Sequence, residues 1–178
     1  MDLFVASGPS GWSVRLGDEI WPCAVGKSGL IREKREGDGA TPVGCWPLRR
    51  VLFRADRLSA PATGLPVAPL SPDDGWCDDP GDGRYNQAVR LPYAGHHERL
   101  WREDGLYDIL VVLGYNDCPP VAGYGSAIFL HVAGPGYAPT EGCVALALPD
   151  LLTVLPAIDL NSRICIDTVC PFGSDANA

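Results

Sequence analysis

One cysteine of the chain stands in a setting that favours nucleophilic chemistry. Cys143 follows a glycine in the stretch TEGCVALALPD, at the point where a Thr-Glu pair ends and an apolar run begins. Gly142 allows a close approach of the backbone and leaves nearby N–H groups available to an oxyanion. Because a thiol attacks a carbonyl carbon as its thiolate, Cys143 needs a base or a positive field beside it.

Three histidines are the candidates for that base. His96 and His97 lie in the charged segment GHHERLWRED, where we expect a solvated pair. His131 ends the apolar stretch AIFLHV, and the glycine- and proline-rich turn AGPGYAP follows it. An imidazole at the rim of a sheet, twelve positions before Cys143 and across a loop, can face that cysteine in space. Spacing alone leaves two interpretations open: a catalytic pair, or a strand-end histidine and a core thiol.

Short strands are the elements that must position these residues. We expect strands over 3–6, 12–16, 19–25, the second part of 37–53, 107–116, 126–132 and 163–169. The apolar character of 107–116 and 126–132 favours central places in a sheet. The Pro-, Ala- and Ser-rich residues 54–74 are expected to run over the surface.

Two short helices complete the predicted elements. Residues 149–158 carry a proline in the first turn and an apolar face of leucines, and residues 95–104 form a second candidate. The sequence therefore predicts a mainly β fold, a β-sandwich or mixed sheets with one or two short helices. We expect a single domain over residues 1–178.

Composition excludes several classes of partner. The 178 residues carry a net charge of −8 without a basic stripe, which argues against nucleic acid. The longest apolar runs are too short to span a membrane. The seven cysteines form no CxxC pair, so we expect no metal site. If one cysteine is the nucleophile, the other six can form up to three disulfides or remain as buried thiols.

The stretch IFLHVAGPGYAPTEGCVAL resembles the signature of the YkuD-type L,D-transpeptidases, in which a His ends a strand and Ser/Thr-x-Gly-Cys follows after a loop. Upstream, EGDGATPVGCWPL resembles the Thr-Pro-x-Gly stretch of that family. The segments GWCDDPGDGRYN and YDILVVLGYND are similar to blocks of its compact branch, so the resemblance covers most of 26–166.

This resemblance implies an acyl transfer at Cys143. Cys143 would be the nucleophile, His131 its base, and the carbonyl of Val132 would hold the imidazole tautomer. The N–H groups around Gly142 and Cys143 would form the oxyanion hole. A peptidoglycan stem peptide would acylate the thiol, and an amine of a second stem would resolve the thioester. The link would be 3,3 between two diaminopimelates or 1,3 between L-alanine and diaminopimelate, with carbapenems as covalent inhibitors and no cofactor.

Two positions depart from the family pattern. The family commonly has His where this chain has Glu141, and often Arg or Asn where it has Ala145. A carboxylate beside the thiol would raise the thiol pKa, so we expect Glu141 to point outward. Ala145 removes a possible anchor for a substrate carboxylate, which leaves the type of link open.

Stem peptides are zwitterionic, so their site needs donors to carboxylates together with polar and aromatic walls. The candidates lie in the turn-rich segment 76–86, at the end of the strongest strand and beside the nucleophile: Trp76, Arg84, Tyr85, Asn86, Tyr115, Asn116 and Thr140. The alternative for 76–86 is a tight loop that caps its own backbone. We read Lys34 and Asp38 as surface charges.

Other functions use the same residues or none of them. Water in place of the acceptor amine would make a peptidoglycan L,D-carboxypeptidase or endopeptidase with the same Cys-His site. A dead site would leave a peptidoglycan-binding module, and a papain-like protease would need Cys before His. The substrate implies a periplasmic location, although the N-terminal MDLFVASGPSGWSVRLGDE shows no secretory signal.

Overall fold

A ring of eight paired strands forms the centre of the computed structural model, which describes residues 1–166. The strands follow the order β11-β12-β13-β3-β2-β1-β14-β6, and pairing between β6 and β11 closes the ring, with β7 attached outside β6. Their bounds are β1 (Leu3–Gly8), β2 (Gly11–Leu16), β3 (Glu19–Ala24), β6 (Gly44–Phe53), β7 (Val67–Pro69), β11 (Ile109–Leu113), β12 (Phe129–Val132), β13 (Val144–Leu146) and β14 (Arg163–Ile166).

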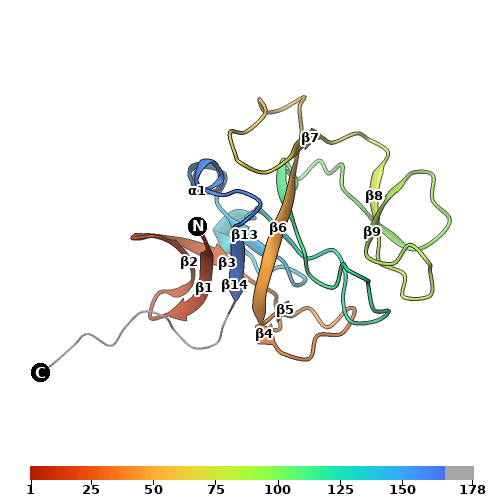
Figure 1. The fold of residues 1–178 in the computed structure, drawn as a ribbon, viewed down its shortest axis with the longest axis horizontal. Helices are drawn as coiled ribbons and strands as arrows, with labels where there is room; N and C mark the ends of the chain where they lie inside the picture. The colour runs from red at the N-terminus through yellow and green to blue at the C-terminus, as the bar shows by residue number, and fades with distance from the viewer. Residues whose placement is uncertain (167–178) are drawn as a thin grey trace, which may run out of the picture.

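Smaller elements surround this ring in the described part of the chain. A three-stranded sheet has the order β10-β8-β9, and β4 pairs with β5. Figure 1 shows β8 and β9 on the opposite side of β6 from β1, β2 and β3. The bounds are β4 (Leu30–Ile31), β5 (Thr41–Pro42), β8 (Asp74–Cys77), β9 (Gln87–Arg90), β10 (His97–Arg99), the helix α1 (Leu148–Val154) and the 3-10 turns η1 (Pro135–Tyr137) and η2 (Leu155–Ala157).

Strand β11 is buried on both faces, and its side chains divide between two cores. Ile109, Val111 and Leu113 pack inside the ring. Leu110 and Val112 point to the other face, where they join a second cluster of buried side chains: Leu52, Leu70, Trp76, Leu100, Tyr107, Phe129 and Cys143. An antiparallel strand covered on both sides reads as a continuous apolar run, as this one does in the sequence.

The expected fold class is confirmed: the chain is mainly β, with mixed sheets and a short helix. The two sheets of the expected sandwich are joined in one closed ring. The strands expected over 3–6, 12–16, 19–25, 37–53, 107–116 and 126–132 are present, and α1 followed by η2 occupies the expected helix at 149–158. Of the strand expected over 163–169, residues 163–166 form β14, and the rest lies outside the described residues.

The helix expected over 95–104 is wrong. His97–Arg99 form β10, which pairs with β8 so that Glu98 lies opposite Trp76. The local helical pattern does not decide the structure here, because pairing with β8 satisfies the backbone hydrogen bonds and brings these residues over the second core. Residues 54–74 run partly over the surface as expected, with the exposed strand β7 against β6.

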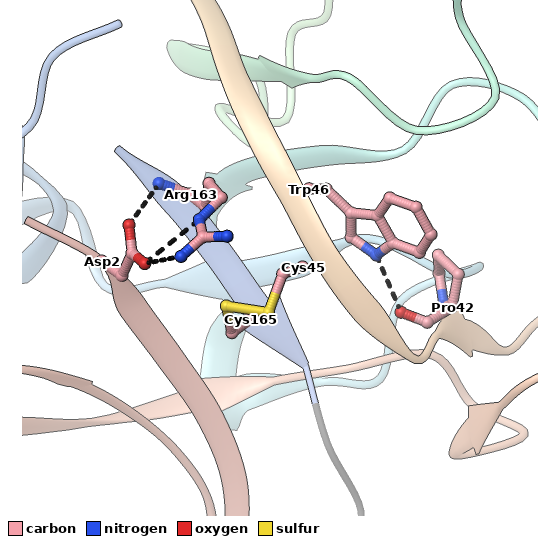
Figure 2. The surroundings of a disulfide bond; sticks show 6 residues. All are labelled: Asp2, Pro42, Cys45, Trp46, Arg163 and Cys165. Carbon is pink, nitrogen blue, oxygen red and sulfur yellow. Dashed lines mark hydrogen bonds and ion pairs between the residues drawn. A yellow bond between two sulfur atoms is a disulfide. The ribbon is translucent and has the colours of Figure 1, made fainter. Parts of the chain in front are cut away.

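A disulfide and an ion pair fix the last described strand (Figure 2). Cys45 and Cys165 are register partners on β6 and β14 and form the disulfide. The Asp2 carboxylate accepts hydrogen bonds from the Arg163 guanidinium at 2.7 Å and its backbone N–H at 2.9 Å. Both outcomes left open for the cysteines therefore occur, because Cys23 and Cys77 are buried free thiols. Cys170 lies outside the described residues.

No helix within residues 1–166 is long and apolar enough to cross a membrane.

Candidate active site

A pocket of about 500 Å³ opens beside β12 and is bounded by the segment before β13 and by the three-stranded sheet. Cys143, His131 and Thr140 line it, as the sequence predicts for a site. Several polar residues that the sequence analysis did not assign to the site also line it: Lys34, Glu36, Asp78, His96, His97, Glu98, Arg102, Tyr107 and Ser126.

Parallel pairing of β12 and β13 brings Cys143 and His131 to one face. Leu130 pairs with Val144 and His131 with Ala145, so Cys143 stands opposite Phe129, two positions before His131. Register partners and every second residue share a face of a sheet, so both reactive side chains point into the pocket. Within the described part of the chain no hydrogen bond joins them.

The Cys143 side chain is held as a thiol in a buried place. Its Sγ donates to the carbonyl of Ala127 at 3.3 Å and accepts from the Phe129 N–H at 3.4 Å. Burial, followed by the charge of Glu98, raises the thiol pKa to about 12. The resting nucleophile is therefore neutral and must lose its proton when it attacks.

His131 is oriented to take that proton. Its Nδ1 lies 2.8 Å from the Val132 carbonyl, which can only accept, so Nδ1 carries the hydrogen and Nε2 is the basic nitrogen. The ring packs edge-on against Tyr107 with centroids 5.2 Å apart. Burial lowers the His131 pKa to about 4, so the imidazole is neutral at physiological pH.

A backbone turn presents Cys143 to the pocket. Gly142 has φ 138°, and a Cβ on it would lie 2.8 Å from the carbonyl oxygen of Ala40. Thr140 Oγ1 donates to the Cys143 carbonyl at 2.6 Å and accepts from the Gly142 N–H at 3.1 Å. The Gly142 N–H is therefore already paired, which corrects the expectation that it is a free donor for an oxyanion. Thr41 Oγ1 also reaches the Cys143 carbonyl, at 3.4 Å.

Asn86 and its neighbours, which the sequence predicts to contact substrate, bind one another and the backbone of nearby loops. Asn86 Oδ1 accepts from Trp76 Nε1 at 2.9 Å and from the Ala127 N–H at 3.0 Å. Its Nδ2 donates to the carbonyls of Tyr115 at 3.0 Å and Asn116 at 2.8 Å. Trp76, Asn86 and Tyr115 are buried, and none of the residues in these contacts apart from Ala127 lines the pocket. This hub holds Ala127, whose carbonyl binds the Cys143 thiol.

The remaining predicted substrate contacts also serve the loops. Tyr85 is buried, donates to Glu36 and accepts from the Gly125 N–H at 3.0 Å. The exposed Arg84 binds the Ala88 carbonyl at 2.9 Å, and Asn116 Nδ2 binds the carbonyls of Val121 and Gly125. None of these side chains lines the pocket. Arg84 and Asn116 bind the backbone of their own loops, whereas Tyr85 joins two distant segments, at Glu36 and Gly125.

Lys34 and Asp38 are wrongly expected on the surface. The Lys34 side chain is 4% exposed and forms an ion pair with Asp38. Gly125 packs directly on its stem: a Cβ there would lie 2.9 Å from Lys34 Cγ. Contact with a glycine ninety-one positions away buries this lysine, so local sequence gave no signal beyond its place just before the Thr-Pro stretch.

The three-stranded sheet supplies a second set of charges to the pocket. Glu98 on β10 accepts from the Tyr107 hydroxyl at 2.5 Å, and burial raises its pKa. Arg102 lies 3.8 Å from Glu98. His96 is exposed as expected but pairs with Asp78 at 2.5 Å, which raises the His96 pKa. The pairing of β10 with β8 brings these residues together. The sequence predicts a helix over 95–104 instead, so Glu98 and Arg102 are not among the predicted site residues.

Glu141 lies at the exposed edge of the pocket, with its carboxylate on Lys27. Its side chain is 78% exposed and pairs with Lys27 at 2.7 Å. Within residues 1–166, no group of three or more His, Cys, Asp or Glu side chains is arranged to hold a metal ion.

A thiol and a neutral imidazole that share a buried face form the arrangement with which proteins attack carbonyl groups through sulfur. The family described as YkuD, L,D-transpeptidase catalytic domain, matches residues 12–166, and the chain belongs to this family. The resemblance drawn from the sequence is thus confirmed.

A comparison with solved structures gives a distant match. The chain is similar to the crystal structure of L,D-transpeptidase 1 of Mycobacterium tuberculosis, with 12% identity and a TM-score of 0.36. The match covers 93% of this chain and 61% of that one, so the chain spans about three fifths of its length. No curated protein sequence matches the chain.

Proposed function

We propose that the chain is a peptidoglycan L,D-transpeptidase that joins stem peptides through a thioester on Cys143. The observation that carries this proposal is the placement of Cys143 and His131 on one face of β12 and β13, inside one pocket. The hydrogen bond from Nδ1 to the Val132 carbonyl supports it, because it leaves Nε2 free to accept the thiol proton.

Acylation follows from this geometry. Cys143 Sγ attacks the donor carbonyl carbon, and the thiol proton passes to His131 Nε2. The Cys143 N–H is the donor we assign to the resulting oxyanion, since the Gly142 N–H is paired with Thr140. Collapse of the adduct breaks the amide bond, and His131 returns the proton to the departing amine. The thioester remains on the enzyme.

Transfer to the acceptor reverses these roles. An amine of a second stem attacks the thioester carbonyl, His131 takes its proton, and the sulfur leaves and is reprotonated. The pocket carries both charges that a zwitterionic stem requires: Arg102 can pair with a carboxylate, while Glu36 and Asp78 can pair with amines. The proposed link is 3,3 between diaminopimelates or 1,3 from L-alanine to diaminopimelate.

The substrate implies that the enzyme works outside the cytoplasm, in the periplasm. The disulfide between Cys45 and Cys165 supports this location, because disulfides persist in oxidising compartments.

A mass-spectrometric time course with purified tetrapeptide, tripeptide and crosslinked muropeptides tests the proposed function. We expect dimers with the intact enzyme and none with Cys143→Ala or His131→Asn. Fragmentation of the dimer identifies the link as 3,3 or 1,3. Exposed Cys118 provides the matched control, and Cys118→Ser should form dimers at the wild-type rate.

Two outcomes would replace this assignment. Loss of a terminal residue or of a crosslink without any dimer would identify a hydrolase with the same thioester. No turnover at all would contradict catalysis and favour a binding module. Incubation with a carbapenem adds an independent reading: we expect a mass increase on the Cys143 peptide that His131→Asn slows strongly.

A further inference from the structure

We propose that the ammonium group of Lys34 stabilises negative charge on the Cys143 sulfur, and so acts as an electrostatic positioning residue of the nucleophile. This inference deepens the proposed function, on which the nucleophilic role of Cys143 rests. It concerns a side chain that neither the thiol–imidazole pair nor the substrate chemistry requires.

Lys34 is fixed beside the nucleophile turn. A Cβ on Gly142 would lie 3.6 Å from Lys34 Nζ, so the ammonium group is next to the residue that precedes the thiol. Lys34 and Cys143 line the same pocket. Because Gly125 packs on its stem and only 4% of the side chain is exposed, the charge stays in a place of low dielectric. A charge in such a place acts more strongly than one in water.

The site has a need for this charge. Burial keeps His131 neutral, so no imidazolium stands beside the resting thiol. Burial and Glu98 raise the Cys143 pKa, whereas the Phe129 N–H, Lys34 and Arg102 lower it. Lys34 is the more buried of these two cations, since 35% of the Arg102 side chain is exposed.

Other titratable groups face the same pocket and must be weighed in any pH measurement. They are Glu36, Asp78, His96, His97, Glu98, Arg102 and Glu141, together with Tyr107 against His131. Asp38 moderates Lys34 directly. Although burial raises the Asp38 pKa, hydrogen bonds from the Arg35 N–H at 2.7 Å and from Lys34 hold it below its ordinary value. The Asp38 carboxylate therefore weakens the positive field that Lys34 exerts at Cys143.

The pH dependence of iodoacetamide alkylation, followed on the Cys143 peptide by mass spectrometry, tests this inference without any peptidoglycan substrate. Below its pKa a thiol reacts in proportion to its thiolate fraction, and one pKa unit is tenfold. We expect Lys34→Met to slow alkylation about five- to tenfold and Asp38→Asn to accelerate it about threefold. The matched control is Lys27→Met, since Lys27 is an exposed lysine paired with Glu141, and its rate should stay within about twofold.

The two opposite changes keep the test decisive. If Lys34→Met fails to fold because it leaves the Asp38 carboxylate unpaired, the double variant Lys34→Met with Asp38→Asn removes both charges and should still react more slowly than wild type. Wild-type alkylation rates in Lys34→Met and in the double variant would overturn the inference. A raised KM for muropeptides with unchanged alkylation would also overturn it, because Lys34 would then bind substrate. Failure of transpeptidation alone leaves the alkylation result standing.

Discussion

At the scale of single residues, the site is built from groups that are neutral until they react. The Cys143 thiol has its pKa raised to about 12 and the His131 imidazole has its pKa lowered to about 4, both first of all by burial. The resting site therefore contains no thiolate that oxidants from the solvent could attack. Proton transfer must therefore accompany the attack on the carbonyl, which makes the base and the local field decisive.

The lowered His131 pKa predicts an unusual acid limb in the rate profile. Because Nε2 must be unprotonated to accept the thiol proton, kcat/KM should fall only near pH 4, where an ordinary histidine would lose activity near 6.5. The measurement is the acylation rate by a carbapenem between about pH 3.5 and about pH 8. A limb centred near the ordinary value would show that His131 is not the base, or is not buried.

The same shift links folding to pH. Between about pH 6.5 and about pH 4 the unfolded chain binds a proton at His131 that the folded chain does not, so stability falls as pH falls. Above about pH 6.5 the free energy of unfolding contains the full contribution of this linkage, about 3 kcal/mol, and the contribution is lost as the pH falls to about 4. Denaturant unfolding of the wild type and His131→Asn across this window measures it. His96, whose pKa is raised, contributes with the opposite sign in both proteins, so the difference isolates His131.

Gly142 is predicted to admit no side chain. In Gly142→Ala the new methyl group meets the Ala40 carbonyl at 2.8 Å and the backbone keeps a φ of 138°, so the turn must shift. We expect a loss of about 2–3 kcal/mol in stability and at least a hundredfold loss in acylation. Gly136→Ala is the control, because Gly136 also has a positive φ but open space around it. Equal behaviour of the two variants would contradict the role of the Ala40 contact.

Asn86 shows how far support extends from the reacting atoms. Asn86→Ala leaves the buried N–H groups of Trp76 and Ala127 without their acceptor, which should lower stability by about 2–4 kcal/mol. Alkylation of Cys143 should change as well, since Ala127 holds the thiol. Thermal unfolding and peptide mass spectrometry together check this, with the exposed Asn161→Ala as control. A stable variant with wild-type alkylation of Cys143 would contradict this supporting role of Asn86.

At the scale of elements, the disulfide is predicted to be the main covalent support of the fold. Cys45 and Cys165 enclose 120 residues, and a bridge across so long a loop restricts the unfolded chain strongly. The double variant Cys45→Ser with Cys165→Ser should unfold with about 2–5 kcal/mol less free energy while its alkylation at Cys143 persists. Chemical denaturation measures the loss, and Cys118→Ser should show none. Unchanged stability would mean that the two strands hold without the bridge.

The elements also show what the sequence could reveal. Strands β11 and β12 were predictable because their residues are almost all buried and, apart from His131, apolar. Spacing alone left the pairing of Cys143 with His131 open, and the resemblance to the family signature added the contact of His131 with the Val132 carbonyl. Strand β10 was not predictable, since its three residues are charged or half-buried and only pairing with β8 makes them a strand. Lys34 was missed for the same reason: a distant glycine buries it.

At the scale of the whole molecule, the closed ring explains why the pocket can be rigid. Both faces of β11 and β12 are packed, one inside the ring and one under the three-stranded sheet. His131 therefore stands on a strand that is packed on both faces, and hydrogen bonds hold Ala127 to Asn86 and to the Cys143 thiol.

The ring has a further consequence for the order in which the chain can fold. Strand β14 lies between β1, near the first residue, and β6, so the ring stays open until residues 163–166 are available. Pairing over such sequence distances is slow, because the loop must close before the contacts form. A chain emerging from the ribosome thus completes its barrel last at β14. Until these residues are made, the edges of β1 and β6 that β14 covers have no partner there, so the nascent chain is open to pairing with strands of other chains.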